Sequence, residues 1–418
     1  MTKTKYAVLV EAAQQKLQHH RHIVLDSIAL EEAFKADTPS HRLAQKLDAI
    51  NKHITVDPEI FKEAAEDYNK IAEHLVEKLH WSNDDIRIIP QGSSRTKTLI
   101  RSPDASKFDI DAVCAVDISR IEANNPMDFF DLVGKALADW EATRKKRCWC
   151  VDFLNRRYYI EFTPSIPLST VPKQIADGIR YRPDRYAHTA LAVVDTPTKQ
   201  WKTSNPVGFA QWVSDQAERH ILMSFALEGR TLDSLASNSI ESVPEQVVPL
   251  SDTLRIAIRL LKRHRDMSVR RGYIESEFRP ISVIIVTLLT QCYEGLADKA
   301  ARYTNPLRLF LDLVELLPEM IEIRGGQYWV ENPTVDGENF AEKWNVNSAL
   351  KKTFDNWCEL LVEDLQHLLN VKDERLLSDK LREVFGSTGA AGVVPTPSGL
   401  TSRTPSRVHA VPATRGLA

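Results

Sequence analysis

The chain has 418 residues, of which 43% are hydrophobic and 27% are charged, a composition typical of folded globular proteins rather than disordered or fibrous ones. This length allows two ordinary domains, or one large core with additions. The formal net charge of −3 excludes a polycation that coats nucleic acid with its whole surface, so any phosphate-binding surface must be local.

The cysteines and the N-terminal residues indicate the cellular compartment of the protein. The five cysteines are scattered, and no two have the CxxC spacing of paired metal ligands: Cys114, Cys148, Cys150, Cys292 and Cys358. Reduced thiols in a cytosolic protein fit this pattern. The apolar run near the start is short and interrupted by Glu11, so it lacks the core of a signal peptide. We expect a cytoplasmic protein with no membrane association.

The first half of the chain changes from helical to strand periodicity. Residues 1–80 predict helices, and one apolar stripe at spacings of three and four runs through Ile60, Ala64, Tyr68, Ile71 and Leu75. Strands are expected over 86–90 and 108–116, a helix over 126–146, and a hairpin with arms 148–153 and 158–163. Strands flanked by helices predict an α/β (α+β) core.

The second half is expected to be mostly helical. Helical patterns cover 206–227, 251–266, 280–296, 305–319, 338–371 and 374–385. From residue 387 the chain has no acid or aromatic residue and is rich in Pro, Gly, Ser and Thr, which predicts a flexible tail. The expected organisation is a helical segment at 1–57, the α/β core at 58–204, a helical domain at 205–386 and a tail at 387–418.

The central motif is Gly92-Ser93, followed sixteen residues later by Asp109 and Asp111. Because Asp109 and Asp111 lie two apart on a predicted strand, both carboxylates project from the same face. Mg²⁺ prefers carboxylate and phosphate oxygens, so this face is suited to hold Mg²⁺ beside a triphosphate. Gly92 would let the backbone approach that triphosphate, and Ser93 offers a hydroxyl and an amide. A solvated sheet edge is the structural alternative.

A third acid is expected on an adjacent strand. Glu161 alternates with Tyr159 on one face of an otherwise apolar strand, which favours it as the third metal ligand or base. Asp152, in the other arm of the same hairpin, is the competing candidate.

These motifs resemble a known family. The run QGSSRTKTLIRSPDASKFDIDAVCAV is similar to the signature of the DNA polymerase β-like nucleotidyltransferase superfamily. More narrowly, the chain resembles the bacterial cGAS/DncV-like nucleotidyltransferases (CD-NTases) of CBASS anti-phage operons. The resemblance extends to LKRHRD at 261–266, RPIS at 279–282, and 332–344, and covers roughly residues 60–370. Most relatives have Asp as the third acid, where this chain has Glu161.

The resemblance implies a polymerase β-like core, a helical second domain, and an active site in the cleft between them. It implies a cyclic oligonucleotide second messenger made from NTPs with two Mg²⁺ ions, or with Mn²⁺ in their place, in anti-phage signalling. Asp109, Asp111 and Glu161 would bind metal. The alternatives are a nucleotidyltransferase acting on tRNA, a protein or a small molecule, and an inactive scaffold that binds nucleotides.

Two further residues gain a role through the resemblance, which places Lys262 and Ser282 on the donor triphosphate. From the pattern alone, Lys262 belongs to a basic helix stripe of the kind that is usually solvated. Ser282 opens an apolar helix, where a hydroxyl commonly bonds the helix N-terminus.

Interactions with macromolecules are expected to be few. The basic run 144–147 fits a solvated helix end better than a nucleic-acid contact, and the predicted activity does not require nucleic-acid binding. In several operons of the resembled family a ubiquitin-transfer-like enzyme conjugates the C-terminus of the cyclase. The extended tail ending at Ala418 would suit that chemistry, and a disordered terminus without a role is the alternative.

Overall fold

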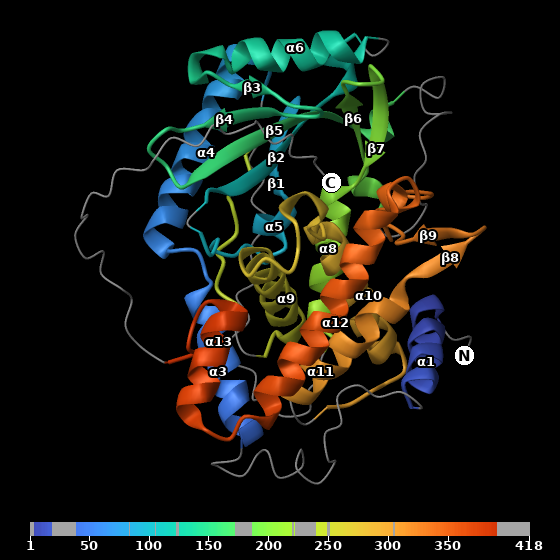
Figure 1. Ribbon diagram of the computed structural model, residues 1–418. Coiled ribbons are helices and arrows are strands. Elements are labelled where there is room, and N and C mark those ends of the chain that lie inside the picture. Colours follow the sequence, from blue (N-terminus) through green and yellow to red (C-terminus); the bar gives the residue numbers. More distant parts are fainter. Residues whose placement is uncertain are drawn as a thin grey trace.

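The computed structural model describes residues 4–18, 39–82, 84–104, 106–122, 125–171, 186–219, 221, 240–248, 251–303 and 306–390. Most of the expected tail, including Ala418, lies outside these residues. Figure 1 shows a sheet in the upper half of the molecule and a body of helices below it. Within the described ranges, no helix is long and apolar enough to cross a membrane.

Seven of the described strands form one mixed sheet. They are β1 (Ile86–Gln91), β2 (Phe108–Val116), β3 (Thr143–Arg144), β4 (Trp149–Asp152), β5 (Tyr158–Pro167), β6 (Leu191–Asp195) and β7 (Gln200–Ser204). The order is β1-β2-β5-β4-β3, and β6 pairs with both β5 and β7. The central pair β2–β5 is parallel and the other pairs are antiparallel.

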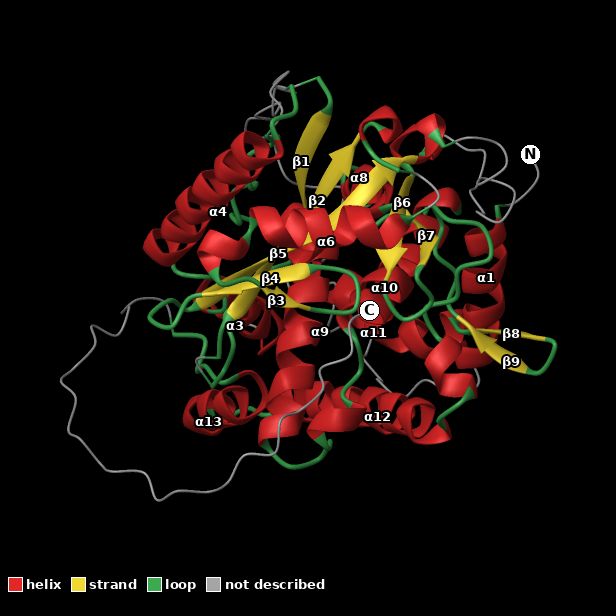
Figure 2. Ribbon diagram, turned by 90° about the horizontal axis from the view of Figure 1, so that it is seen from above, coloured by secondary structure: helices red, strands yellow, loops and turns green. Residues whose placement is uncertain are grey.

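Two helices cover one face of this sheet. They are α4 (Pro58–Leu79) and α6 (Pro126–Ala136), and Figure 2 shows α6 lying across the strands. The side chain of Asp57 caps α4 by accepting from the amides of Glu59 and Ile60, and Pro58 occupies the first turn. Of the predicted apolar stripe, Tyr68, Ile71 and Leu75 are fully buried against the sheet, and Ala64 with them.

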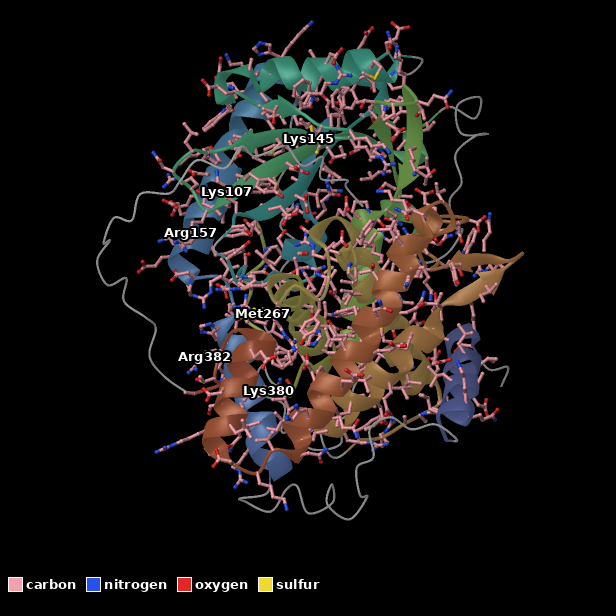
Figure 3. The ribbon with its side chains drawn as sticks, in the orientation of Figure 1. Lys107, Lys145, Arg157, Met267, Lys380 and Arg382 are labelled. Atoms are coloured by element: carbon pink, nitrogen blue, oxygen red, sulfur yellow. The ribbon has the colours of Figure 1, made fainter. Side chains whose placement is uncertain are left out.

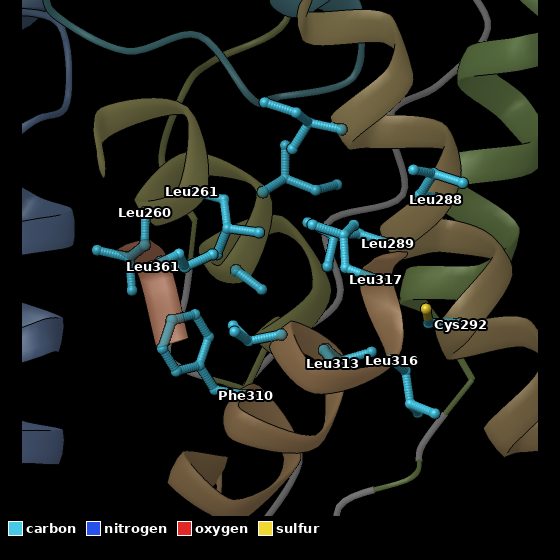
Figure 4. Close-up of a cluster of buried hydrophobic side chains, with 14 of the residues drawn as sticks. Leu260, Leu261, Leu288, Leu289, Cys292, Phe310, Leu313, Leu316, Leu317 and Leu361 are labelled. Atoms are coloured by element: carbon cyan, nitrogen blue, oxygen red, sulfur yellow. The ribbon is translucent and has the colours of Figure 1, made fainter. Parts of the chain in front are cut away.

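The lower half has its own hydrophobic core, part of which Figure 4 shows. Its helices are α1 (Lys5–Gln18), α3 (Pro39–His53), α8 (Pro206–Ala217), α9 (Thr253–Arg270), α10 (Ser282–Asp298), α11 (Pro306–Leu316), α12 (Ser348–Asn370) and α13 (Glu374–Phe385). The N-terminal helices belong here, because α1 packs on α10 and α3 packs on α9. The chain therefore starts in the helical half, crosses to the sheet and returns.

The segment that precedes α9 returns to the sheet edge. Ile240 forms a parallel bridge with Ile88 of β1, and the Glu241 amide donates to the Ile88 carbonyl at 2.9 Å. The Glu241 carboxylate also pairs with Arg87 and Arg95. This strap covers the edge strand, which would otherwise present unpaired backbone groups.

The helix predicted over 126–146 is longer than the helix α6 that the structure shows. It ends at Ala136, and a 3₁₀ turn and Glu141 in left-handed conformation lead into β3. This reversal brings β4 back onto α6, where Trp149 packs against Gly134 and donates to the Phe130 carbonyl at 2.9 Å. The basic run 144–147 is therefore not a helix end, since it begins in β3.

Two predictions in the second half also need correction. The helix expected over 338–371 begins at Ser348, because the Asn347 side chain caps it by accepting from the Ala349 amide. A short hairpin that was not predicted, β8 (Glu322–Arg324) and β9 (Gln327–Trp329), turns at Gly325 and Gly326. Both glycines have positive φ, which a two-residue hairpin turn requires. The helix expected over 206–227 ends at Ala217 in the described residues.

Candidate active site

The two aspartates lie side by side on the open face of β2. Asp109 and Asp111 are partly exposed, whereas Ile110 and Ala112 point the other way and are fully buried under α4 and α6. In the parallel register of β2 and β5, Asp111 is directly beside Glu161 and Asp109 is beside Tyr159. Three carboxylates from two neighbouring strands therefore share one face of the sheet.

The competing acid, Asp152, has a different environment. It is opposite Tyr159 on β4, one strand farther from β2, and it is exposed. Its carboxylate pairs with Lys107. Figure 3 shows Lys107 at the margin of the sheet, away from its centre. The structure thus brings Glu161, and not Asp152, beside the two aspartates.

The carboxylates repel one another in a poorly solvated place. Burial, followed by the negative charges of Asp109 and Glu161, raises the pKa of Asp111 well above its usual range, and Lys262 opposes this. The pKa of Glu161 is also raised, chiefly by burial, although the hydrogen bond from the Cys148 thiol counteracts the rise. A divalent cation would relieve this repulsion.

The donor set fits Mg²⁺ in its chemistry, since all three groups are carboxylates. In the part of the chain that the structure describes, however, no three His, Cys, Asp or Glu side chains converge in an arrangement that could hold a metal ion. At Glu161, the Oε2 atom accepts a hydrogen bond from Cys148 Sγ at 3.1 Å. The longer side chain thus bonds toward β4 instead of closing on the aspartates.

Gly92 brings the backbone close to Asp111. It begins the one-turn helix α5 (Gly92–Arg95) directly after β1 and has φ of +63°. A Cβ atom at this position would lie 2.3 Å from Asp111 Oδ2, so a larger residue cannot fit without displacing the carboxylate. Both the left-handed conformation and the close approach require glycine here.

Ser93 and Lys262 connect the two halves of the molecule. Lys262 Nζ, from α9 in the helical half, donates to Ser93 Oγ at 2.9 Å and to the Thr98 carbonyl at 2.8 Å. The lysine is 4% exposed, so the basic stripe of α9 is not solvated at this position. Burial, followed by the positive charge of Arg265, lowers the pKa of Lys262 to about 8, while Asp109 acts in the opposite direction.

Ser282 joins this group through an arginine. It is the first residue of α10, and its Oγ accepts from Arg265 at 2.9 Å instead of capping the helix. Arg265 is buried, and it also donates to the Pro280 carbonyl and to Asp266. Sequence reasoning missed Arg265 as a site residue, although it stands in the LKRHRD motif three residues after Lys262.

Gln91 and Cys148 were also missed. Gln91 pairs with Asp111 in the register of β1 and β2, and its Nε2 donates to Thr163 Oγ1 at 3.3 Å. Cys148 directly precedes β4 and contacts Glu161. Neither side chain carries a charge, so no feature of the sequence pattern distinguished it from ordinary core residues.

A family model matches the segment that carries the acids. Residues 86–164 match the model described as the nucleotidyltransferase domain of cyclic GMP-AMP synthase DncV-like proteins. This segment runs from β1 into β5 and includes Gly92, Ser93, Asp109, Asp111 and Glu161.

Relatives and solved structures extend the comparison to most of the chain. A c-di-GMP synthase of Roseivirga ehrenbergii is 23% identical over 372 residues, which cover 87% of this chain and 84% of the relative. The structure of the Bradyrhizobium diazoefficiens CD-NTase CdnG in complex with GTP matches with a TM-score of 0.56 and 20% identity, over 84% of this chain and 96% of that one. Escherichia coli MS115-1 CdnC with ATP matches with a TM-score of 0.50 and 14% identity, over 83% and 99%. The predicted α/β nucleotidyltransferase fold is confirmed.

Proposed function

We propose that this chain, which belongs to the bacterial cGAS/DncV-like nucleotidyltransferases, joins nucleoside triphosphates into a cyclic oligonucleotide second messenger. The observation that carries the proposal is the register of β2 and β5. It places Asp109, Asp111 and Glu161 on one open face, with Lys262 and Ser93 at its border.

The acids are the proposed metal ligands. Asp109, Asp111 and Glu161 would together hold two Mg²⁺ ions. When bound, the ions would supply Lewis acidity to the acceptor hydroxyl and to the departing pyrophosphate. Mn²⁺ has the same ligand preference for oxygen and could replace Mg²⁺.

The remaining residues would bind and orient the donor triphosphate. Lys262 would exchange its neutral oxygen partners for phosphate oxygens, with Ser93 donating beside it. Gly92 would leave room for the phosphates against the backbone. Ser282 would bind the triphosphate together with Arg265. The Ser282 hydroxyl already accepts a hydrogen bond from the Arg265 guanidinium.

The reaction then follows from in-line displacement. A ribose hydroxyl of one nucleotide attacks the α-phosphorus of another, an oxygen–phosphorus bond forms, and the bond to the β-phosphate oxygen breaks to release pyrophosphate. The proton of the hydroxyl leaves to solvent or to Glu161. A second displacement within the linear intermediate closes the ring.

The test uses the purified chain with labelled NTPs and Mg²⁺ and no other substrate. We expect a phosphatase-resistant oligonucleotide, and no such product from an Asp109→Ala, Asp111→Ala double variant. A product formed only after adding tRNA, a protein or a small molecule would indicate a different nucleotidyltransferase. Nucleotide binding without turnover under all conditions would indicate an inactive scaffold.

The cellular setting is proposed from the same family membership. We expect the chain to act in the cytoplasm during anti-phage signalling. We also propose that a ubiquitin-transfer-like enzyme conjugates the tail at Ala418. Deleting residues 412–418 should then remove covalent high-mass species from cells that carry the native operon and leave NTP turnover in vitro unchanged. Unchanged high-mass species would contradict conjugation.

A further inference from the structure

Two buried thiols flank the third acid on the side away from the aspartates. Cys150 is directly opposite Glu161 in the antiparallel register of β4 and β5. Cys148 donates to Glu161 Oε2 at 3.1 Å. Cys148 and Cys150 are 2% and 4% exposed, and Glu161 is 6% exposed. The carboxylate therefore lies between Asp111 on β2 and two thiols, that of Cys148 directly before β4 and that of Cys150 on β4.

These thiols can only act as neutral donors. Burial, followed by the negative charge of Glu161, raises the pKa of Cys148, and burial raises the pKa of Cys150 to about 12. Neutral S–H groups satisfy a buried carboxylate without supplying a positive charge, so Glu161 has partners before any cation is present.

The side chain of Glu161 has the reach to change partners. Glutamate has one methylene more than aspartate and hence one more rotatable bond. Its position beside Asp111 on the neighbouring strand brings it within range of the acid pair, while its carboxylate bonds to Cys148.

We propose that Cys148 is a positioning residue that holds Glu161 in a metal-free orientation, so that the thiol opposes the binding of a divalent cation. This inference rests on the proposed function for the identity of the cation site. A hydrogen bond present only in the metal-free state stabilises that state, and by linkage it weakens metal binding by the same factor.

The test measures metal binding directly. Mn²⁺ is titrated into the protein without nucleotide and followed by electron paramagnetic resonance. Cys148→Ala should bind Mn²⁺ about tenfold more tightly, the factor that corresponds to one hydrogen bond to a charged group. Cys148→Ser keeps a donor at this position and should bind like the wild type.

Two controls separate positioning from general structural effects. Cys114→Ala removes a buried thiol from β2 on the opposite face of the sheet and should leave Mn²⁺ affinity unchanged. In a Glu161→Gln background, Cys148→Ala should have no further effect, because the two changes act through one contact. Melting temperatures of Cys148→Ala and of the wild type are compared with and without Mn²⁺. The loss of stability in the variant should be larger when Mn²⁺ is absent.

The outcomes are distinct. Weaker or unchanged Mn²⁺ binding by Cys148→Ala would overturn the inference, and so would the same gain in the Glu161→Gln background. A wild-type protein that binds Mn²⁺ but makes no oligonucleotide would contradict the proposed function and leave this measurement valid. If Cys148→Ala fails to fold, Cys148→Val, which fills the site without donating, provides the same comparison.

Discussion

The two faces of the central sheet perform different tasks with alternate residues of the same strands. On one face Ile110, Ala112 and Ile160 are fully buried against α4 and α6. On the other face Asp109, Asp111 and Glu161 repel one another at the border of the helical half. One face therefore stabilises the fold through burial, whereas repulsion between the clustered carboxylates destabilises the other face. Substitutions at adjacent positions should separate the two tasks.

The largest difference in turnover and stability is expected between substitutions at two neighbouring residues of β2, Ile110 and Asp111. Asp111→Ala should reduce product formation at least a hundredfold, the upper end for loss of a metal-site group, while its melting temperature holds or rises because repulsion is relieved. Ile110→Ala should lose about 2–5 kcal/mol of unfolding free energy from the cavity it leaves. Turnover assays and thermal unfolding of both variants test this. An Asp111→Ala variant with near-normal turnover would remove Asp111 from the site.

A substitution at Gly92, which closely approaches Asp111, should have a nearly equal effect on turnover. Gly92→Ala places a methyl group where Asp111 Oδ2 now lies and strains a backbone with positive φ, so we expect a cost of about 1–3 kcal/mol in stability together with loss of turnover. Gly272→Ala is a matched control, because Gly272 also has positive φ but nothing lies within 4 Å of the added Cβ. Equal turnover in both variants would show that the contact with Asp111 is unimportant.

Lys262 should affect nucleotide binding more than folding. Lys262→Ala removes the proposed phosphate partner and should weaken binding of a non-hydrolysable NTP analogue by about 1.5–3 kcal/mol. The wild-type affinity should also decrease as pH rises through about 8, where the buried ammonium loses its proton. Calorimetric titrations between neutral and alkaline pH would show a steeper decrease for wild type than for Lys262→Ala. Parallel decreases would contradict a role for this charge.

The smallest effect is expected for Asp152. Asp152→Asn weakens only an exposed ion pair with Lys107, so turnover and stability should stay close to wild type. Glu161→Gln should abolish turnover and keep some triphosphate binding through the two aspartates. The reverse result in paired turnover assays would make Asp152 the third acid.

The local periodicity of the sequence predicted more of the site than its long-range pairing. Alternation along 108–116 is sufficient to place Asp109 and Asp111 on one face, because the period of a strand is two. The position of Glu161 beside Asp111 depends on a parallel pairing across about 50 residues, which no local pattern specifies. The roles of Asp109, Asp111, Glu161, Gly92, Ser93, Lys262 and Ser282 remain predictions.

Burial was the property that sequence patterns predicted least well. The basic stripe on α9 has the composition of a solvated helix face, yet Arg259, Lys262 and Arg263 are at most 4% exposed. They are buried because α9 packs under the loop after α5 and against α3 and α13. Backbone carbonyl groups of these segments accept hydrogen bonds from the three side chains. A charged pattern cannot distinguish water from such acceptors.

The helical half is built from parts of the chain that the sheet separates. Its core includes Tyr6 and Val10 of α1, and Leu43, Leu47 and Ile50 of α3, together with residues from beyond 205. A contiguous fragment of residues 205–386 would therefore expose the apolar surfaces that α1 and α3 cover. We therefore expect that the proposed domain limits do not mark independently folding units. Excising either half should give an aggregating polypeptide, and supplying residues 1–57 in trans should restore solubility to the helical fragment.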